Sequence, residues 1–237
     1  MSSIAPPAWT LVLPVKPFTQ AKSRLATRHG IRRSDLARAF FEDTLGAVRT
    51  TTGVGSVLVV TADRQAAAIA RSAGALTVPD EPQAGLNAAI RTAVRHAQHM
   101  GADGPIAVLT CDLPALRGAE LAEVLDAAAG HARAFLADHT RRGTTLLAAA
   151  HPRWLEPSFE GGSRDRHLAA GAFEITDPQV PGARLDVDTL DDLRRARQLG
   201  LGRHTRAVLG QTGTAVPRSP GLTYTPVREG TAPHGLH

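Results

Sequence analysis

The chain has 237 residues, of which 43% are hydrophobic, which is enough for the core of one sizeable domain. It contains no apolar run near the ~20 residues that span a bilayer, and its first residues lack the pattern of a secretory signal, so we expect no membrane association. One cysteine, Cys111, excludes an internal disulfide framework and favours a reducing, cytoplasmic location. The net charge is +5, but the arginines are scattered and aromatic residues make up 4% of the chain, which argues against a nucleic-acid partner.

Short apolar runs alternate with amphipathic stretches, which is typical of an α/β protein with a mostly parallel mixed sheet flanked by helices. Strands are predicted at residues 10–15, 56–61, 75–78, 106–110, 132–137, 144–150 and 184–187. Apolar residues three or four apart predict helices near residues 36–48, 86–97 and 121–128, with a shorter helix at 163–170. Thr189 has the position of an N-cap, with acids in the next turn and Gly200 at the far end, so a further helix is predicted between them.

These elements predict a single α/β domain over residues 1–202. Residues 203–237 are rich in Gly, Pro and Thr and show no periodicity, so we expect an extended or disordered C-terminal tail.

The loop after the first predicted strand holds both lysines of the chain, Lys16 and Lys22, together with Ser23 and Arg24. Such a group can neutralise a triphosphate, although a solvated basic loop would have the same composition. The chain has neither a Gly-x-x-x-x-Gly-Lys-Ser/Thr loop nor a Gly-x-Gly-x-x-Gly turn, which argues against a P-loop hydrolase and a classical dinucleotide dehydrogenase.

Aspartates follow two of the predicted strands. Asp112 comes after the strand at 106–110, where it can hold Mg2+ or cap the next turn. Asp186 and Asp188 alternate at the end of the predicted strand 184–187, which would put them on one side, about 7 Å apart. Either one could complete a metal site with Asp112.

Two further groups of polar residues are candidates for binding. Asp80, Gly85 and Asn87 lie on a strand-to-helix turn, where a base or ribose could be recognised or the polar groups could serve only the turn. Thr144 and the Gly162–Ser163 pair offer hydroxyls and open amides that suit an anionic acceptor, although glycine-rich loops are often simple turns.

The segments PVKPFTQAKSRL, PDEPQAGLNAAI, VLTCDLPAL, ADHTRRGTT, SFEGGSRDRH and DVDTLDDL occur in this order along the chain. Together they resemble the phosphoenolpyruvate or 2-phospho-L-lactate guanylyltransferases of coenzyme F-420 biosynthesis. The resemblance implies a nucleotidyltransferase domain with a single Rossmann-like sheet. It also implies a reaction in which the acceptor phosphate attacks the α-phosphorus of GTP and releases pyrophosphate.

The resemblance also implies roles for individual residues. The triphosphate would be held by Lys22 and Arg24, which with Asp112 form the implied catalytic group, and Lys16 and Ser23 would lie nearby. The pocket for the nucleoside would be lined by Asp80, Gly85 and Asn87. Mg2+ would be bound by Asp112 and Asp186, with Asp188 as the alternative second ligand. The acceptor would be received by Thr144, Gly162 and Ser163.

The chain departs from the family pattern in both acceptor loops: Arg141 and Arg142 replace the usual glycine and threonine, and Glu160 replaces a glycine. The sequence therefore leaves open whether the acceptor is phosphoenolpyruvate or 2-phospho-L-lactate. The alternatives are a nucleotidyltransferase with another phosphorylated acceptor, such as a molybdenum cofactor or a sugar phosphate, a non-catalytic GTP-binding protein, and a nucleic-acid binder that uses the basic tail. A downstream transferase that consumes the product is an expected partner, and the oligomeric state is left open.

Overall fold

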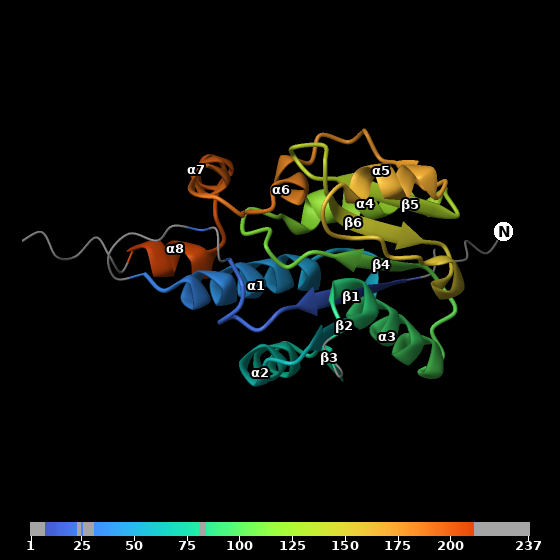
Figure 1. Ribbon diagram of the computed structural model, residues 1–237, viewed down its shortest axis with the longest axis horizontal. Helices are drawn as coiled ribbons and strands as arrows, with labels where there is room; N and C mark the ends of the chain where they lie inside the picture. Colours follow the sequence, from blue (N-terminus) through green and yellow to red (C-terminus); the bar gives the residue numbers. More distant parts are fainter. Residues whose placement is uncertain (1–7, 23–24, 26–30, 81–83, 211–237) are drawn as a thin grey trace, which may run out of the picture.

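The computed structural model describes residues 8–22, 25, 31–80 and 84–210 (Figure 1). Within them a seven-stranded sheet has the order β3-β2-β1-β4-β6-β5-β7. The strands are β1 (Trp9–Val15), β2 (Val54–Thr61), β3 (Leu76–Pro79), β4 (Ile106–Leu109), β5 (Arg133–Ala137), β6 (Thr144–Ala149) and β7 (Phe173–Glu174). The helices are α1 (Arg33–Arg49), α2 (Arg64–Ser72), α3 (Leu86–His99), α4 (Gly118–Ala129), α5 (Ser163–Ala169), α6 (Pro181–Arg184), α7 (Leu190–Leu199) and α8 (Arg203–Gly210), with a 3-10 turn at Pro152–Trp154.

The direction of the strands brings several loops to one edge of the sheet. β1 pairs in parallel with β2 and β4, whereas β6 runs antiparallel to both β4 and β5. The carboxyl ends of β1, β4 and β5 and the amino end of β6 therefore meet at the same edge. The chain order reverses between β1 and β4, and ligands of open α/β sheets bind at such a switch point.

Helices cover both faces of the sheet, which explains why its strands read as nearly continuous apolar runs. Leu11 and Leu13 of β1 share a core with residues of α1, α2 and α4, while Val12 packs with residues of α3 on the other face. Phe135 of β5 is fully buried on the α3 face. The predicted α/β class with a mixed, mostly parallel sheet is confirmed.

A third apolar cluster lies at one end of the molecule, where α7 and α8 lie near α1 (Figure 1). Thr189 caps α7 as predicted, since its hydroxyl accepts a hydrogen bond from the Asp192 amide. The carboxylate of Asp43 in α1 accepts hydrogen bonds from the amides of His204 and Thr205, both at 2.9 Å. The expectation of an extended tail from residue 203 is therefore wrong for residues 203–210. These residues form a helix whose first amides donate hydrogen bonds to Asp43 of α1, a residue far away in the sequence. Residues 211–237 lie outside the described residues.

The strand predicted at residues 184–187 is also wrong. Arg184 is the last residue of α6, and residues 185–187 pair with no strand of the described sheet. Instead, the Val187 amide donates to the carbonyl of Asp112 at 3.0 Å, and the His139 amide donates to the carbonyl of Arg184 at 2.8 Å. These two bonds hold the segment beside the ends of β4 and β5. The short strand β7 was not predicted. None of the described helices combines the length and the apolar character needed to cross a bilayer.

Candidate active site

A cavity of about 780 Å³ opens at this edge of the sheet. Its described lining comes from the loops after β1, β4 and β5, the start of β6, the loop before α5 and the segment before α7, with apolar side chains from α1 and the first residue of α3. The residues that bring charge or hydrogen-bonding groups to it include Lys16, Gln20, Lys22, Thr110, Asp112, Asp138, Thr140, Arg142, Thr144, Glu160, Ser163, Asp186 and Asp188. One cavity thus collects cations, carboxylates and hydroxyls from segments far apart in the sequence.

Lys22 is held between two of the aspartates. Its Nζ lies 2.7 Å from Asp112 Oδ2 and 2.9 Å from Asp188 Oδ1, and its side chain is only 8% exposed. The backbone at Lys22 has a φ of 59°, in the left-handed region that few residues other than glycine adopt. Burial alone would lower the pKa of Lys22, but the two carboxylates outweigh that effect and raise it. The ammonium is therefore charged and neutralises the carboxylates at the centre of the cavity.

Asp112 and Asp186 lie half-buried at this ion pair, with side chains 26% and 24% exposed. Burial, reinforced by the negative charges of Asp112, Asp138 and Asp188, raises the pKa of Asp186 to about 8. For Asp112, burial opposes ionisation, but the Lys22 ammonium outweighs it and lowers the pKa. The Oδ1 atoms of Asp112 and Asp186 are buried and accept no hydrogen bond from the described residues, although His139 Nδ1 lies 3.5 Å from Asp186 Oδ1.

Carboxylate oxygens are the donors that a hard divalent cation prefers, so the residues present fit such an ion. No three acidic, histidine or cysteine side chains within the described ranges are grouped as a ready-made metal site. The Lys22 ammonium instead occupies the space between two of the three aspartates. A cation that bound there would take over the charge neutralisation that Lys22 provides.

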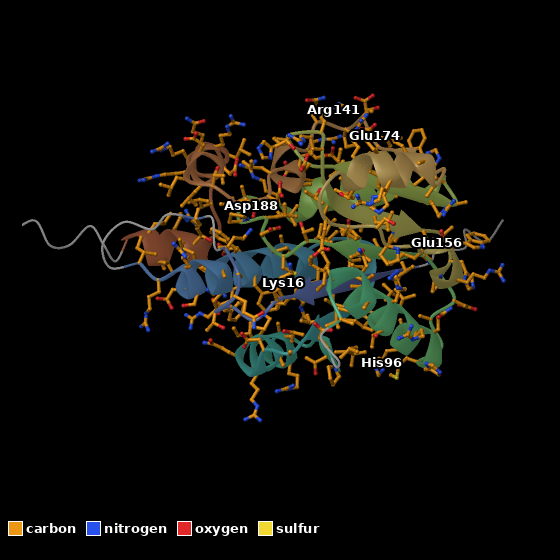
Figure 2. The ribbon with its side chains drawn as sticks, viewed as in Figure 1. Lys16, His96, Arg141, Glu156, Glu174 and Asp188 are labelled. Atoms are coloured by element: carbon orange, nitrogen blue, oxygen red, sulfur yellow. The ribbon has the colours of Figure 1, made fainter. Side chains whose placement is uncertain are left out.

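Lys16 and Glu160 face each other across the cavity mouth. Their side chains are 60% and 57% exposed, and Lys16 Nζ lies 3.7 Å from Glu160 Oε1. Figure 2 labels Lys16 in the middle of the molecule, below Asp188. Glu160 has a φ of 78°, a backbone conformation that glycine adopts at lower cost. The carboxylate of Glu160 thus lies beside a cation, although an ion pair this exposed contributes little stability.

The loop that carries Glu160 is fixed from two sides. Asn87 of α3 accepts a hydrogen bond from the Phe159 amide at 2.8 Å and donates one to the Phe159 carbonyl at 3.2 Å. The guanidinium of Arg166 in α5 donates to the carbonyls of Ser158, Phe159, Glu160 and Gly161. The loop is therefore set before any ligand binds, and the Asn87 amide is committed to it.

The two arginines that depart from the family pattern have different environments. Arg141 Nη2 donates to Glu174 at 2.9 Å, and Figure 2 shows these two residues side by side at the outer surface. Arg142 lines the cavity, and within the described ranges its guanidinium makes no hydrogen bond or ion pair. Its amide donates to Asp138 Oδ1 at 3.0 Å, and its carbonyl accepts from the Arg164 amide at the start of α5. Arg142 is thus placed to meet an anion in the cavity, and Arg141 is not.

The structure brings together most of the residues that the sequence predicted. The cavity is lined by Lys16, Lys22, Asp112, Thr144, Gly162, Ser163, Asp186 and Asp188. Asp80, Gly85 and Asn87 are not part of this lining, so their nucleoside role stays a prediction. Ser23 and Arg24 lie outside the described residues.

The sequence interpretation missed Asp138, Thr140 and His167. Asp138 directly follows β5, and this is the signal by which Asp112 was recognised after β4. Its carboxylate accepts hydrogen bonds from the amides of Arg142 and Gly143 and from Thr140 Oγ1. It thereby shapes the loop that leads into β6. His167 showed no such signal, because its partners lie on other segments of the chain.

The chain resembles known proteins over most of its length. The family described as "Guanylyl transferase CofC like" matches residues 9–223. A protein of Streptomyces scabiei named phosphoenolpyruvate guanylyltransferase is 48% identical over 204 residues, which cover 84% of this chain and 94% of that protein. A protein of the same name from Thermomonospora curvata is 44% identical over 200 residues, with 84% and 88% covered.

Solved structures of lower identity share the fold. A putative nucleotide-diphospho-sugar transferase from Desulfovibrio desulfuricans superposes with a TM-score of 0.61 at 14% identity, covering 86% of this chain and 95% of that one. A 4-diphosphocytidyl-2C-methyl-D-erythritol synthase does so with a TM-score of 0.56 at 15% identity, covering 81% and 99%. The resemblance and the fold class expected from the sequence are confirmed. The chain is a nucleotidyltransferase and belongs to the CofC-like family of guanylyltransferases.

Proposed function

We propose that this protein transfers GMP from GTP to the phosphate of phosphoenolpyruvate and releases pyrophosphate, as a step of coenzyme F-420 biosynthesis. The observation that carries the proposal is that one cavity joins the Lys16–Lys22 loop, four aspartates and the Thr144–Ser163 pair. The names of the relatives support phosphoenolpyruvate as the acceptor. The free Cys111 supports a cytoplasmic setting.

The reaction needs little covalent help from side chains, because its nucleophile is already an anionic phosphate. It needs charge neutralisation and alignment of the attacking oxygen with the leaving pyrophosphate. We assign Lys22 and Lys16 to the phosphates of GTP, with Arg24 and Ser23 as further candidates. In this assignment Lys22 exchanges its carboxylate partners for phosphate oxygens when the nucleotide binds.

Asp112 and Asp186 are the residues that would hold Mg2+, with Asp188 as the alternative second ligand. The buried Oδ1 atoms of Asp112 and Asp186, which accept no hydrogen bond from the described residues, support this choice. When bound, the ion supplies positive charge to the triphosphate. The raised pKa of Asp186 means that this carboxyl gives up a proton when it becomes a ligand.

Thr144, Gly162 and Ser163 are assigned to the acceptor, together with the unpaired guanidinium of Arg142. A small acid with a carboxylate and a phosphate needs donors and positive charge at both ends. Arg142 adds a cation on this side of the cavity. Lys16 offsets the charge of Glu160, which would otherwise repel an anionic acceptor.

The test is pyrophosphate release from GTP and Mg2+ with phosphoenolpyruvate or 2-phospho-L-lactate supplied separately, and with the downstream transferase added to draw off the product. Release with phosphoenolpyruvate at the higher kcat/KM is expected. Pyrophosphate release with 2-phospho-L-lactate but not with phosphoenolpyruvate would show that 2-phospho-L-lactate is the acceptor. GTP binding without pyrophosphate release with either acid would contradict the proposal.

A further inference from the structure

A buried hydrogen-bonded group lies directly behind the acceptor side of the cavity. It consists of Thr144 at the start of β6, Ser163 at the start of α5, and His167 one turn further along α5. The three residues are 6%, 2% and 1% exposed. Thr144 and Ser163 also line the cavity, whereas His167 does not.

Hydrogen bonding determines which ring nitrogen of His167 carries the proton. The backbone amide of Ser158 donates to His167 Nε2 at 3.2 Å, so Nε2 must be unprotonated. A neutral ring then carries its proton on Nδ1, which lies 3.0 Å from Thr144 Oγ1. Nδ1 therefore donates to the threonine and cannot accept from it.

The ring stays neutral at physiological pH. Burial, with a smaller contribution from the charge of Arg166, lowers the pKa of His167 to about 4. The ring also packs between Phe135 and Phe159, with centroids 5.6 and 5.5 Å away, so it cannot turn to exchange its two nitrogens without disturbing the core.

The tautomer decides what the two hydroxyls can do. Ser163 Oγ donates to Thr144 Oγ1 at 3.0 Å, which uses one of the two hydroxyl hydrogens. Because His167 donates to Thr144, the other hydrogen has no acceptor within this group and is left for a ligand in the cavity. The opposite tautomer would accept the Thr144 hydrogen, so a ligand could receive a hydroxyl hydrogen only if Ser163 gave up its bond to Thr144.

We infer that His167 is a positioning residue for the acceptor: through its Nδ1–H tautomer it keeps one hydroxyl hydrogen of the Thr144–Ser163 pair directed at the acid's anionic group. The inference rests on the proposed function, because it assumes that an anionic acceptor binds at these hydroxyls. It assigns His167 no proton transfer and no contact with the acceptor.

Two substitutions separate the donor from the acceptor role of the ring. His167→Asn keeps an N–H donor near the place of Nδ1, and His167→Gln keeps a polar group near the place of Nε2 but does not reach Thr144. We expect His167→Gln to raise the KM of phosphoenolpyruvate about tenfold or more, as for the loss of one hydrogen bond to a charged group. The KM of GTP should stay unchanged, and His167→Asn should stay within about threefold of the original enzyme.

A double-mutant cycle tests whether His167 acts through Thr144. Thr144→Val should raise the acceptor KM by itself, and adding His167→Gln to it should have no further effect. Additive effects, or equal changes in the KM of GTP and of the acid, would mean that His167 only supports the fold and would overturn the inference.

The tautomer can be measured in the unmodified protein by nitrogen-15 NMR of the histidine ring. A proton on Nδ1 at pH 7 is the expected result, and a proton on Nε2 would overturn the inference even if the variants fail to fold. This measurement needs no turnover. Failure of the proposed function would instead appear as a lack of pyrophosphate release by the original enzyme.

Discussion

Replacing Lys22 by methionine removes the positive charge between Asp112 and Asp188 while keeping an unbranched side chain of similar length. Breaking a buried ion pair by removing one partner typically costs 3–5 kcal/mol, because the remaining charge is left buried without compensation. The Lys22 side chain is 8% exposed, but those of Asp112 and Asp188 are 26% and 54% exposed, so solvent screens the pair in part and the lower end of that range applies. We expect Lys22→Met to lower the free energy of unfolding by about 3 kcal/mol when no divalent cation is present.

Lys16→Met is the matched control, since it removes the other lysine of the same loop. Its ion pair with Glu160 is exposed on both sides, so a loss of no more than about 1 kcal/mol is expected. For a domain of this size, the difference corresponds to a melting temperature about 4–8 °C lower for Lys22→Met than for Lys16→Met.

The assay is urea unfolding of both variants and the original protein in EDTA, repeated with millimolar Mg2+. Mg2+ should recover most of the stability of Lys22→Met, because a bound cation replaces the missing ammonium. The reasoning would be refuted if both lysine variants had the same stability in EDTA, or if Mg2+ stabilised them equally.

Three further predictions concern the cavity and the buried group behind it. Asp112→Asn should lower kcat at least a hundredfold with an unchanged circular dichroism spectrum, because the charged ligand is lost; near-normal turnover with ordinary Mg2+ dependence would contradict its metal role. Arg142→Ala should raise the KM of phosphoenolpyruvate about tenfold. Arg141→Ala, which removes only the ion pair with Glu174, should change this KM less than twofold. Equal effects of the two substitutions would argue against an acceptor role for Arg142. Because the folded state lowers the pKa of His167 to about 4, the stability this neutral ring contributes is complete above pH 6.5 and is lost as the pH falls toward 4. Between pH 7 and pH 5 the free energy of unfolding should fall by about 2 kcal/mol more in the original protein than in His167→Gln, and parallel pH curves would refute this.

Local patterns in the sequence were enough to predict most of the fold. The predicted strands agree with β1 to β6 to within about two residues at their ends, because strands covered on both faces must be apolar along their length. Thr189 was recognised as an N-cap because capping involves residues only three apart. The lysine loop and Asp112 were predicted to lie at the site because they follow strands, and the structure places Lys16, Lys22 and Asp112 in one cavity.

Only the tertiary structure decided how these charges are used. Lys22 meets Asp112 and Asp188 across 90 and 166 residues of chain, and Asn87 meets Phe159 across 72, so no local pattern encodes either contact. Arg141 and Arg142 are neighbours in sequence, yet one pairs with Glu174 at the surface and the other lines the cavity. The sequence by itself determined which residue types could bind a nucleotide and an acid. The packing of distant segments decided which of them share one cavity, because burial and charge pairing depend on neighbours that the chain supplies only once it is folded.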